Sequence, residues 1–246
     1  MRNPKKIRFV SQVFSLALAM AFVLSGDFVS AREGGPDADE IVARARMSAA
    51  MQEGDLQGHL SDGRRRTPFV LSMADGVMQF RFSSPDQVVS LAIGDGEPEF
   101  KEVLEGDARE IVGERFGESV RDTVITYEDL ALRFLFWPKA ELLDEEQLKG
   151  RPAWKLRLNN PQREGPYAVV LVWIDQETSA LMRVQGYDWQ GALVKQFEVV
   201  SVMPVGDTWM LKEMRVERLE GGRVRGRTWL RLDEPVREGS GRRPNL

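Results

Sequence analysis

The chain has 246 residues, of which 42% are hydrophobic and 29% are charged, so it is long enough to bury one large core or two small ones. Its net charge of −4 disfavours nucleic acids and anionic membrane surfaces as partners, because both are negatively charged. The chain contains no cysteine, which excludes disulfide bonds, a thiolate nucleophile, cysteine-ligated zinc and lipidation of a cysteine.

The first 31 residues have the pattern of a secretory signal peptide. Basic residues come first (Arg2, Lys5, Lys6 and Arg8), an apolar run follows over residues 10–24, and small residues precede a cleavage point after Ala31. An uncleaved membrane anchor is disfavoured, because three polar residues interrupt a run that is shorter than the roughly 20 residues of a spanning helix. We therefore expect a periplasmic protein that begins near Arg32. Removing four basic residues and one acidic residue from totals of 34 and 38 gives this mature form a net charge of −7.

The mature chain opens with one predicted helix and continues with predicted strands. Within residues 36–54, acidic residues precede apolar residues at helical spacing, and a glycine closes the segment. Beyond it, turn dipeptides such as Asp62-Gly63 separate short apolar runs, which is typical of strands. The alternation over residues 77–84 places Phe80 and Phe82 on one face of such a strand.

The segment from 124 to 138 is very apolar for so charged a chain. Thr126 is placed to cap a helix with acidic residues in its first turn, and a proline ends the segment. Apolar residues recur at helical spacing from Tyr127 to Phe134, and others, among them Trp137, add more apolar surface than one sheet face can bury. Two possibilities remain open at this point: the helix fills a concave sheet, or it borders a cavity.

The C-terminal half predicts an antiparallel meander, since strand-like runs follow one another over residues 153–232 with short polar or glycine-bearing gaps. A two-residue loop at Gln190-Gly191 places Arg183 opposite Glu198, which makes one face of this hairpin polar. The opposite, apolar face then holds Met182, Val184, Phe197 and Val199.

A second hairpin is predicted at Glu220-Gly221-Gly222. A three-residue loop there pairs Glu217 with Arg225 and keeps Met214 and Leu230 on the apolar face. The next strand carries a stripe of arginines (Arg223, Arg225, Arg227 and Arg231). We interpret the stripe as a solvated outer face balanced by acidic residues of the preceding strand, rather than as an anion site.

Candidate catalytic and metal-ligating residues are scarce. His59 is the only histidine, and nothing is spaced with it for a metal site or a catalytic triad, so we interpret it as a structural or surface residue. The cluster Asp144-Glu145-Glu146 is interpreted as a solvated turn, and Gly94-Asp95-Gly96 lacks the lysine and the strand-to-helix context of a phosphate loop. We expect no enzymatic activity, no metal site and no cofactor.

Several motifs resemble the outer-membrane lipoprotein-sorting family of LolA-like exported proteins. They are TYEDL at 126–130 before an aromatic-rich segment, KGRPAWKLRL at 149–158, WID at 173–175, and P-x-G-x-x-W at 204–209. The likeness runs from residue 36 to 235 and is strongest after residue 120. It implies a mainly β (α+β) fold, a half-open antiparallel β-barrel covered by short helices, whose apolar concave side binds acyl chains.

The resemblance implies that the apolar face lines a cavity and that the segment 124–138 is its lid. The expected cavity residues are Phe80, Phe82, Trp154, Leu156, Met182, Val184, Phe197, Val199, Met214 and Leu230. The expected lid residues are Tyr127, Leu130, Phe134 and Trp137. In the carriers of the family an arginine inside the barrel helps to hold the lid. Arg81 is the nearest candidate, but alternation places it opposite Phe80 and Phe82, so that role stays unassigned.

The resemblance also implies a function and its partners. We expect a monomeric carrier or chaperone that shields acyl chains of lipoproteins or lipids and exchanges them with inner- or outer-membrane transfer proteins, with no nucleic acid partner. One alternative is an envelope sensor or adaptor that uses the same cavity, and the least favoured alternative is a lipid-modifying enzyme. The expected organisation is a signal peptide over 1–31, a LolA-like domain over 32–235 and a disordered tail over 236–246.

Overall fold

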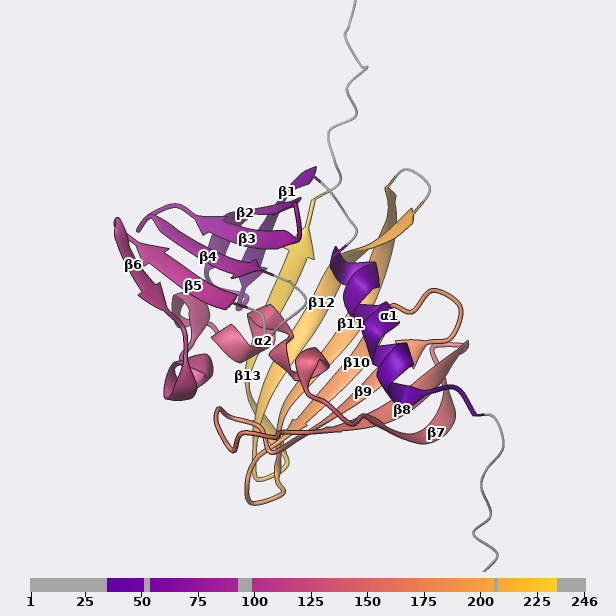
Figure 1. The fold of residues 1–246 in the computed structure, drawn as a ribbon. Coiled ribbons are helices and arrows are strands. Elements are labelled where there is room, and N and C mark those ends of the chain that lie inside the picture. The colour runs from indigo at the N-terminus through magenta and orange to yellow at the C-terminus, as the bar shows by residue number, and fades with distance from the viewer. Residues whose placement is uncertain (1–34, 51–53, 93–98, 206–207, 234–246) are drawn as a thin grey trace, which may run out of the picture. The chain divides into compact units, whose positions relative to one another are not determined.

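A computed structural model describes residues 35–50, 54–92, 99–205 and 208–233 (Figure 1). The expected signal peptide, the Gly94-Asp95-Gly96 turn and the expected tail lie outside these residues. The strands within them are β1 (Gly54–Ser61), β2 (Arg66–Ala74), β3 (Val77–Phe82), β4 (Gln87–Ala92), β5 (Glu99–Leu104), β6 (Asp107–Glu110), β7 (Glu141–Leu148), β8 (Arg151–Asn159), β9 (Val169–Asp175), β10 (Leu181–Tyr187), β11 (Leu193–Val205), β12 (Thr208–Glu220) and β13 (Arg223–Leu232).

These 13 strands form one antiparallel sheet in the order β6-β5-β4-β3-β2-β1-β13-β12-β11-β10-β9-β8-β7. Strands that follow one another in the chain are paired, except β6 and β7, which lie at opposite edges of the sheet, and the pairing of β1 with β13 joins the two halves. Among the described residues β6 and β7 are free edges, so the sheet does not close. The predicted fold class, a half-open antiparallel barrel with few short helices, is confirmed.

One face of the sheet carries the main hydrophobic core. In β3, Phe80 and Phe82 are buried while Arg81 between them is exposed, as the alternation predicts. The helix α1 (Ala38–Ala50) adds Ile41 and Val42 to the same core. Figure 1 shows that α1 and the second short helix, α2 (Tyr127–Ala131), lie on the concave side of the curved sheet.

The β10–β11 hairpin has the predicted register. Arg183 lies opposite Glu198 and Val184 opposite Phe197, and an ion pair of 3.6 Å joins the first two residues. Nearer the turn, a bulge between Gly186 and Tyr187 shifts the pairing by one residue, which the sequence did not indicate.

The β12–β13 hairpin has the predicted faces but a different register. Glu217 lies opposite Arg227, not Arg225, because the loop has two residues and a bulge follows at Arg218. Gly221 and Gly222 both have positive φ, 57° and 73°, which is the conformation that a tight two-residue hairpin turn requires. The shift of two positions preserves alternation, so the arginine stripe lies on the outer face as predicted. Arg227 pairs there with Glu217.

The acidic cluster Asp144-Glu145-Glu146 is not a turn, as the sequence interpretation had it, but part of edge strand β7. Glu146 accepts hydrogen bonds from the Lys155 ammonium at 2.7 Å and from the Trp173 indole at 2.8 Å. Its neighbours remain exposed. Charged side chains on an edge strand oppose pairing with another chain, so the cluster has a structural role at this edge.

Candidate ligand-binding face

The concave face brings together most of the residues that the sequence proposed for a cavity. Six of them are buried in the main core: Phe80, Phe82, Leu156, Val184, Phe197 and Leu230. Trp154 and Met214 are partly buried against this core. Val199 is half-buried and lies opposite Met214.

Met182 does not lie on this face. A bulge between Leu181 and Arg183 in β10 changes the register with β9, and Met182 packs instead in a separate cluster with Trp173. The prediction that Met182 shares a face with Val184 is therefore wrong. The physical reason is that one extra residue in a strand reverses the alternation on one side of it.

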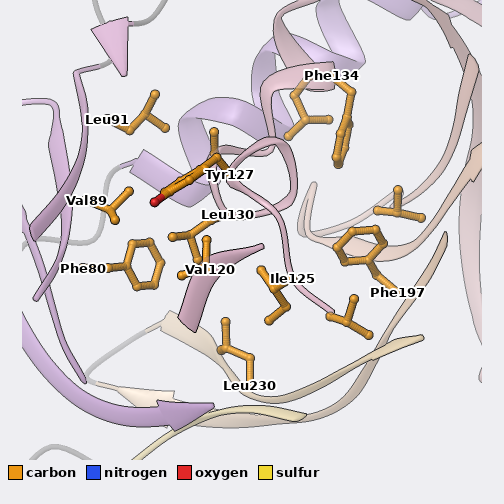
Figure 2. Close-up of a cluster of buried hydrophobic side chains, with 14 of the residues drawn as sticks. Phe80, Val89, Leu91, Val120, Ile125, Tyr127, Leu130, Phe134, Phe197 and Leu230 are labelled. Atoms are coloured by element: carbon orange, nitrogen blue, oxygen red, sulfur yellow. The ribbon is translucent and has the colours of Figure 1, made fainter. Parts of the chain in front are cut away.

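Residues 111–137, called the cover segment below, pack across the concave face. This segment contains the short turns η1 (Gly113–Gly117) and η2 (Val120–Asp122), helix α2 and the turn η3 (Arg133–Phe136). The four expected lid residues, Tyr127, Leu130, Phe134 and Trp137, are all at most 7% exposed. Figure 2 shows Leu130 near Phe80 and Phe134 directed toward Phe197, whose ring centroid is 6.5 Å away. In this structure the side chains of the cover segment occupy the concave face.

Helix α2 begins where the sequence predicted and ends earlier. Thr126 caps it, accepting a hydrogen bond from the Asp129 backbone N–H, while the Asp129 side chain accepts from the Thr126 backbone N–H. Leu132 then adopts a left-handed conformation with φ of 47°, and η3 follows. The predicted single helix is thus broken into two pieces, which allows apolar residues on several sides to reach the core.

A buried polar group fastens the cover segment to the sheet. Asp129 accepts hydrogen bonds from the Tyr167 hydroxyl at 2.5 Å and from the ammonium of Lys195, on β11, at 2.9 Å. Lys195 also donates to the carbonyl oxygen of Val124. The ring of Tyr167 reaches this position only because residue 186 is glycine: a Cβ there would lie 2.6 Å from the ring. We call the position in which the cover segment lies on the concave face the closed position. Because burying unpaired charges is costly, the pairing of Asp129 with Lys195 favours this closed position.

A second buried group ties the cover segment to the other half of the sheet. Glu102 on β5 accepts hydrogen bonds from the Tyr127 hydroxyl, from Gln87 at 2.6 Å and from Arg115 at 2.9 Å. Burial opposes ionisation of Glu102, but these three donors outweigh it and hold its pKa below the usual value. Burial, together with the adjacent Glu102, raises the pKa of Tyr127, which therefore remains a hydrogen-bond donor.

Glu128 is the one buried carboxyl of this region with an incomplete set of partners among the described residues. Its Oε2 accepts a hydrogen bond from Arg133 at 3.0 Å, while its Oε1 is buried without a partner. Burial raises the pKa of Glu128 to about 7, although the nearby Arg133 acts in the opposite direction. The guanidinium of Arg133 lies 4.2 Å from the ring centroid of Phe116, within the same segment.

The sequence interpretation missed Lys195 and Tyr167 as partners of the cover segment. Alternation identifies Lys195 only as a residue of a strand, and Tyr167 lies in a loop. Their contacts join positions far apart in the chain, since Asp129 and Lys195 are 66 residues apart. Arg81, the candidate left unassigned, is exposed and donates a hydrogen bond to Gln79, so it does not hold the cover segment.

The fold and the covered apolar face place the protein among half-open antiparallel barrels of the LolA type. A family profile described as "Uncharacterized protein" matches residues 106–235, just over half of the chain, and the chain belongs to that family. A search of curated proteins gives no match. In the described residues no helix is long and apolar enough to span a bilayer.

Three solved structures resemble this one closely in fold. A domain described as an outer membrane lipoprotein-sorting protein, from Vibrio parahaemolyticus, has a TM-score of 0.63 at 18% identity, with 80% of this chain and 92% of that chain covered. A DUF1329 family protein from Desulfovibrio piger has a TM-score of 0.62 at 19% identity, with coverages of 80% and 91%. A LolA superfamily protein from Nitrosomonas europaea has a TM-score of 0.60 at 14% identity, with coverages of 81% and 93%. At these identities the likeness establishes the shared fold.

Proposed function

We propose that the protein is an exported carrier, beginning near Arg32 in the periplasm, that binds acyl chains of lipoproteins or lipids on its concave face. The cover segment occupies that face in the unliganded protein and moves aside, at least in part, when an acyl chain enters. The fold shared with an outer membrane lipoprotein-sorting domain supports the proposal. So does the predominance of apolar side chains on the concave face.

The observation that carries the proposal is the way in which the cover segment is attached. Within the described chain it contributes no strand to the sheet, and it is held by side-chain contacts such as those of Asp129 and Glu102. Its first residue donates a backbone hydrogen bond to β5, from the Ile111 N–H to the Phe100 carbonyl oxygen at 2.9 Å. The rest of the segment can therefore leave the face without breaking the backbone pairing of any strand. An acyl chain that replaces it restores the lost apolar contacts, because each methylene group removed from water contributes about 0.8 kcal/mol.

The polar attachments set the cost of opening. When the cover segment moves, the ammonium of Lys195 and the carboxylate of Asp129 lose each other, and both must find water or another partner. Binding of a ligand must offset the free energy of opening as well as the cost of desolvating the ligand. The apparent affinity for the ligand therefore equals the intrinsic affinity multiplied by the fraction of the protein that is open.

The experiment measures binding of a fluorescent fatty acyl probe to wild-type protein and to Lys195→Met. The substitution leaves Asp129 buried without its cation, which disfavours the closed arrangement. We expect a lower melting temperature together with tighter probe binding, about tenfold for each 1.4 kcal/mol by which the closed state is weakened. The matched control, Lys101→Met, removes an exposed lysine paired with Glu99 and should change neither quantity.

The outcomes separate a movable cover from a permanent core. If the concave face is permanently filled, Lys195→Met lowers the melting temperature, and neither it nor wild type binds the probe. That result would overturn the proposed function. If the protein instead acts as a sensor or adaptor, it binds the probe but is captured with a signalling protein rather than with a lipoprotein carrier or acceptor.

A further inference from the structure

The buried polar contact around Asp129 has two sides, and only one of them belongs to the sheet. Oδ1 of Asp129 accepts a hydrogen bond from the Tyr167 hydroxyl at 2.5 Å, and Oδ2 accepts one from the Lys195 ammonium at 2.9 Å. Lys195 is a residue of β11 and Tyr167 lies in the loop between β8 and β9, whereas Asp129 is part of the cover segment. When the cover segment moves, Asp129 leaves and the two donors stay behind.

Opening removes every hydrogen bond that the Lys195 ammonium makes within the described part of the chain. The ammonium donates to two groups, the Asp129 carboxylate and the Val124 carbonyl oxygen, and both belong to the cover segment. The side chain is well sheltered in the closed position, since Lys195 is 5% exposed. Opening therefore leaves a cation on the concave face, where an unpaired charge is costly.

The Tyr167 hydroxyl keeps its place on the sheet. The ring lies over Gly186 of β10, and the Tyr167 carbonyl oxygen accepts a hydrogen bond from the Asn160 side chain at 2.8 Å. The next residue, Ala168, donates its backbone N–H to the Tyr187 carbonyl oxygen at 2.8 Å. Burial raises the pKa of Tyr167, so its hydroxyl stays protonated and remains a donor.

The two donors lie at the border of the apolar part of the concave face. Lys195 and Phe197 are both buried and share one face of β11, with their backbones roughly 6.6 Å apart along the strand. Phe197 lies opposite Val184 on one side and Val216 on the other, and both valines are buried. A ligand with an anionic group at the end of an acyl chain would therefore contact the donors and the apolar side chains together.

We propose that the Asp129 carboxylate occupies the position in which the anionic group of the ligand binds, so that the carrier prefers ionised fatty acids to uncharged acyl esters. The inference rests on the proposed function and names its ligand class. A fatty acid carboxylate that replaces Asp129 restores the ion pair with Lys195 and the hydrogen bond from Tyr167. An ester restores the apolar contacts and leaves the Lys195 charge without a counterion.

The test compares the affinities of a fluorescent long-chain fatty acid and of its methyl ester at pH 8, where the acid is ionised. Both ligands require the same opening, so the ratio of the two affinities depends on the anionic group and not on the cost of opening. Wild type should bind the acid at least about tenfold more tightly than the ester. Lys195→Met should lose most of this preference, although it binds the uncharged ester more tightly than wild type because its closed position is weaker.

A second variant and a control accompany this comparison. Tyr167→Phe keeps the ring over Gly186 and removes one hydrogen bond, so it should reduce the preference for the acid by roughly threefold or more. Lys101→Met removes an exposed lysine that pairs with Glu99 and should leave the preference unchanged. If Lys195→Met does not fold, wild type and Tyr167→Phe still decide the question.

The outcomes distinguish this inference from the proposed function. Equal affinity of wild type for the acid and the ester would overturn the inference and leave the carrier function in place. A preference for the acid that persists in folded Lys195→Met and in Tyr167→Phe would also overturn it, because the anionic group would then bind elsewhere. Absence of binding of both ligands would overturn the proposed function and the inference with it.

Discussion

At the scale of single residues, a few buried polar side chains decide how the concave face is covered. Asp129 satisfies its two carboxylate oxygens with Tyr167, Lys195 and a backbone N–H, whereas the adjacent Glu128 has one oxygen without a partner among the described residues. Burial without full compensation favours the protonated form of Glu128, so the two neighbouring carboxyl groups have different environments.

The raised pKa of Glu128 predicts a dependence of stability on pH. Since this pKa is about 7 in the folded protein and near 4.5 in the unfolded chain, the folded state binds more protons between these values. Stability should therefore fall as pH rises from 4.5 to 7. Urea unfolding at pH 5 and pH 8 should show that Glu128→Gln reduces this fall by roughly 2 to 3 kcal/mol.

The control for this prediction is Glu164→Gln, which changes an exposed carboxyl group in the nearby loop. It should leave the dependence on pH as it is in wild type. If Glu128→Gln and wild type lose the same stability between pH 5 and pH 8, the prediction is wrong. Glu128 is then ionised throughout this range, and its negative charge is stabilised by more than the contact with Arg133.

At the scale of elements, periodicity predicted which face of each strand is buried, and irregularities limited the prediction. Alternation placed Phe80, Phe82 and Val184 correctly in the core. The bulge next to Met182 has no glycine to signal it, and the left-handed Leu132 that ends α2 has none either. In both places packing with distant segments overrides the local pattern. A single sequence does not show which distant segments pack together, so it does not predict these irregularities.

The register of β10 and β11 predicts coupling between Arg183 and Glu198. In the structure Glu198 also contacts Arg215 and Lys149, so its reversal to arginine should be more destabilising than reversal of Arg183. The double swap should be more stable than the sum of the two single effects by about 0.5–1 kcal/mol, because it restores the cross-strand pair. A double-mutant cycle by urea unfolding measures this, and additive effects would contradict the register.

At the scale of the whole molecule, the sequence was sufficient for the fold and insufficient for the state of the site. A meander of consecutive strands is set largely by local pairing, and the family resemblance pointed to the same architecture. Whether the segment 124–138 borders a cavity or fills the sheet depends on contacts such as that of Asp129 with Lys195, across 66 residues. The structure shows the filled arrangement, and we propose that ligand binding requires the open one.

The central claim, that the cover segment must move for an acyl chain to bind, is open to a direct test by a reversible cross-link. A Cβ at Gly226 on β13 would lie 2.7 Å from Cγ1 of Val124 in the cover segment. Because Cγ1 is one bond from its own Cβ, the two Cβ atoms are at most about 4.3 Å apart, within the range of a disulfide. The chain has no cysteine of its own, so this bond is the one intramolecular disulfide that Val124→Cys/Gly226→Cys can form.

The decisive measurement is acyl-probe binding to Val124→Cys/Gly226→Cys before and after reduction, with Val124→Cys alone as the control for the substitution. The account predicts that the oxidised protein does not bind the probe, that reduction restores binding, and that the single variant binds under both conditions. Equal binding by the oxidised and reduced forms would contradict it, because the acyl chain would then enter while the cover segment remains fixed to the sheet.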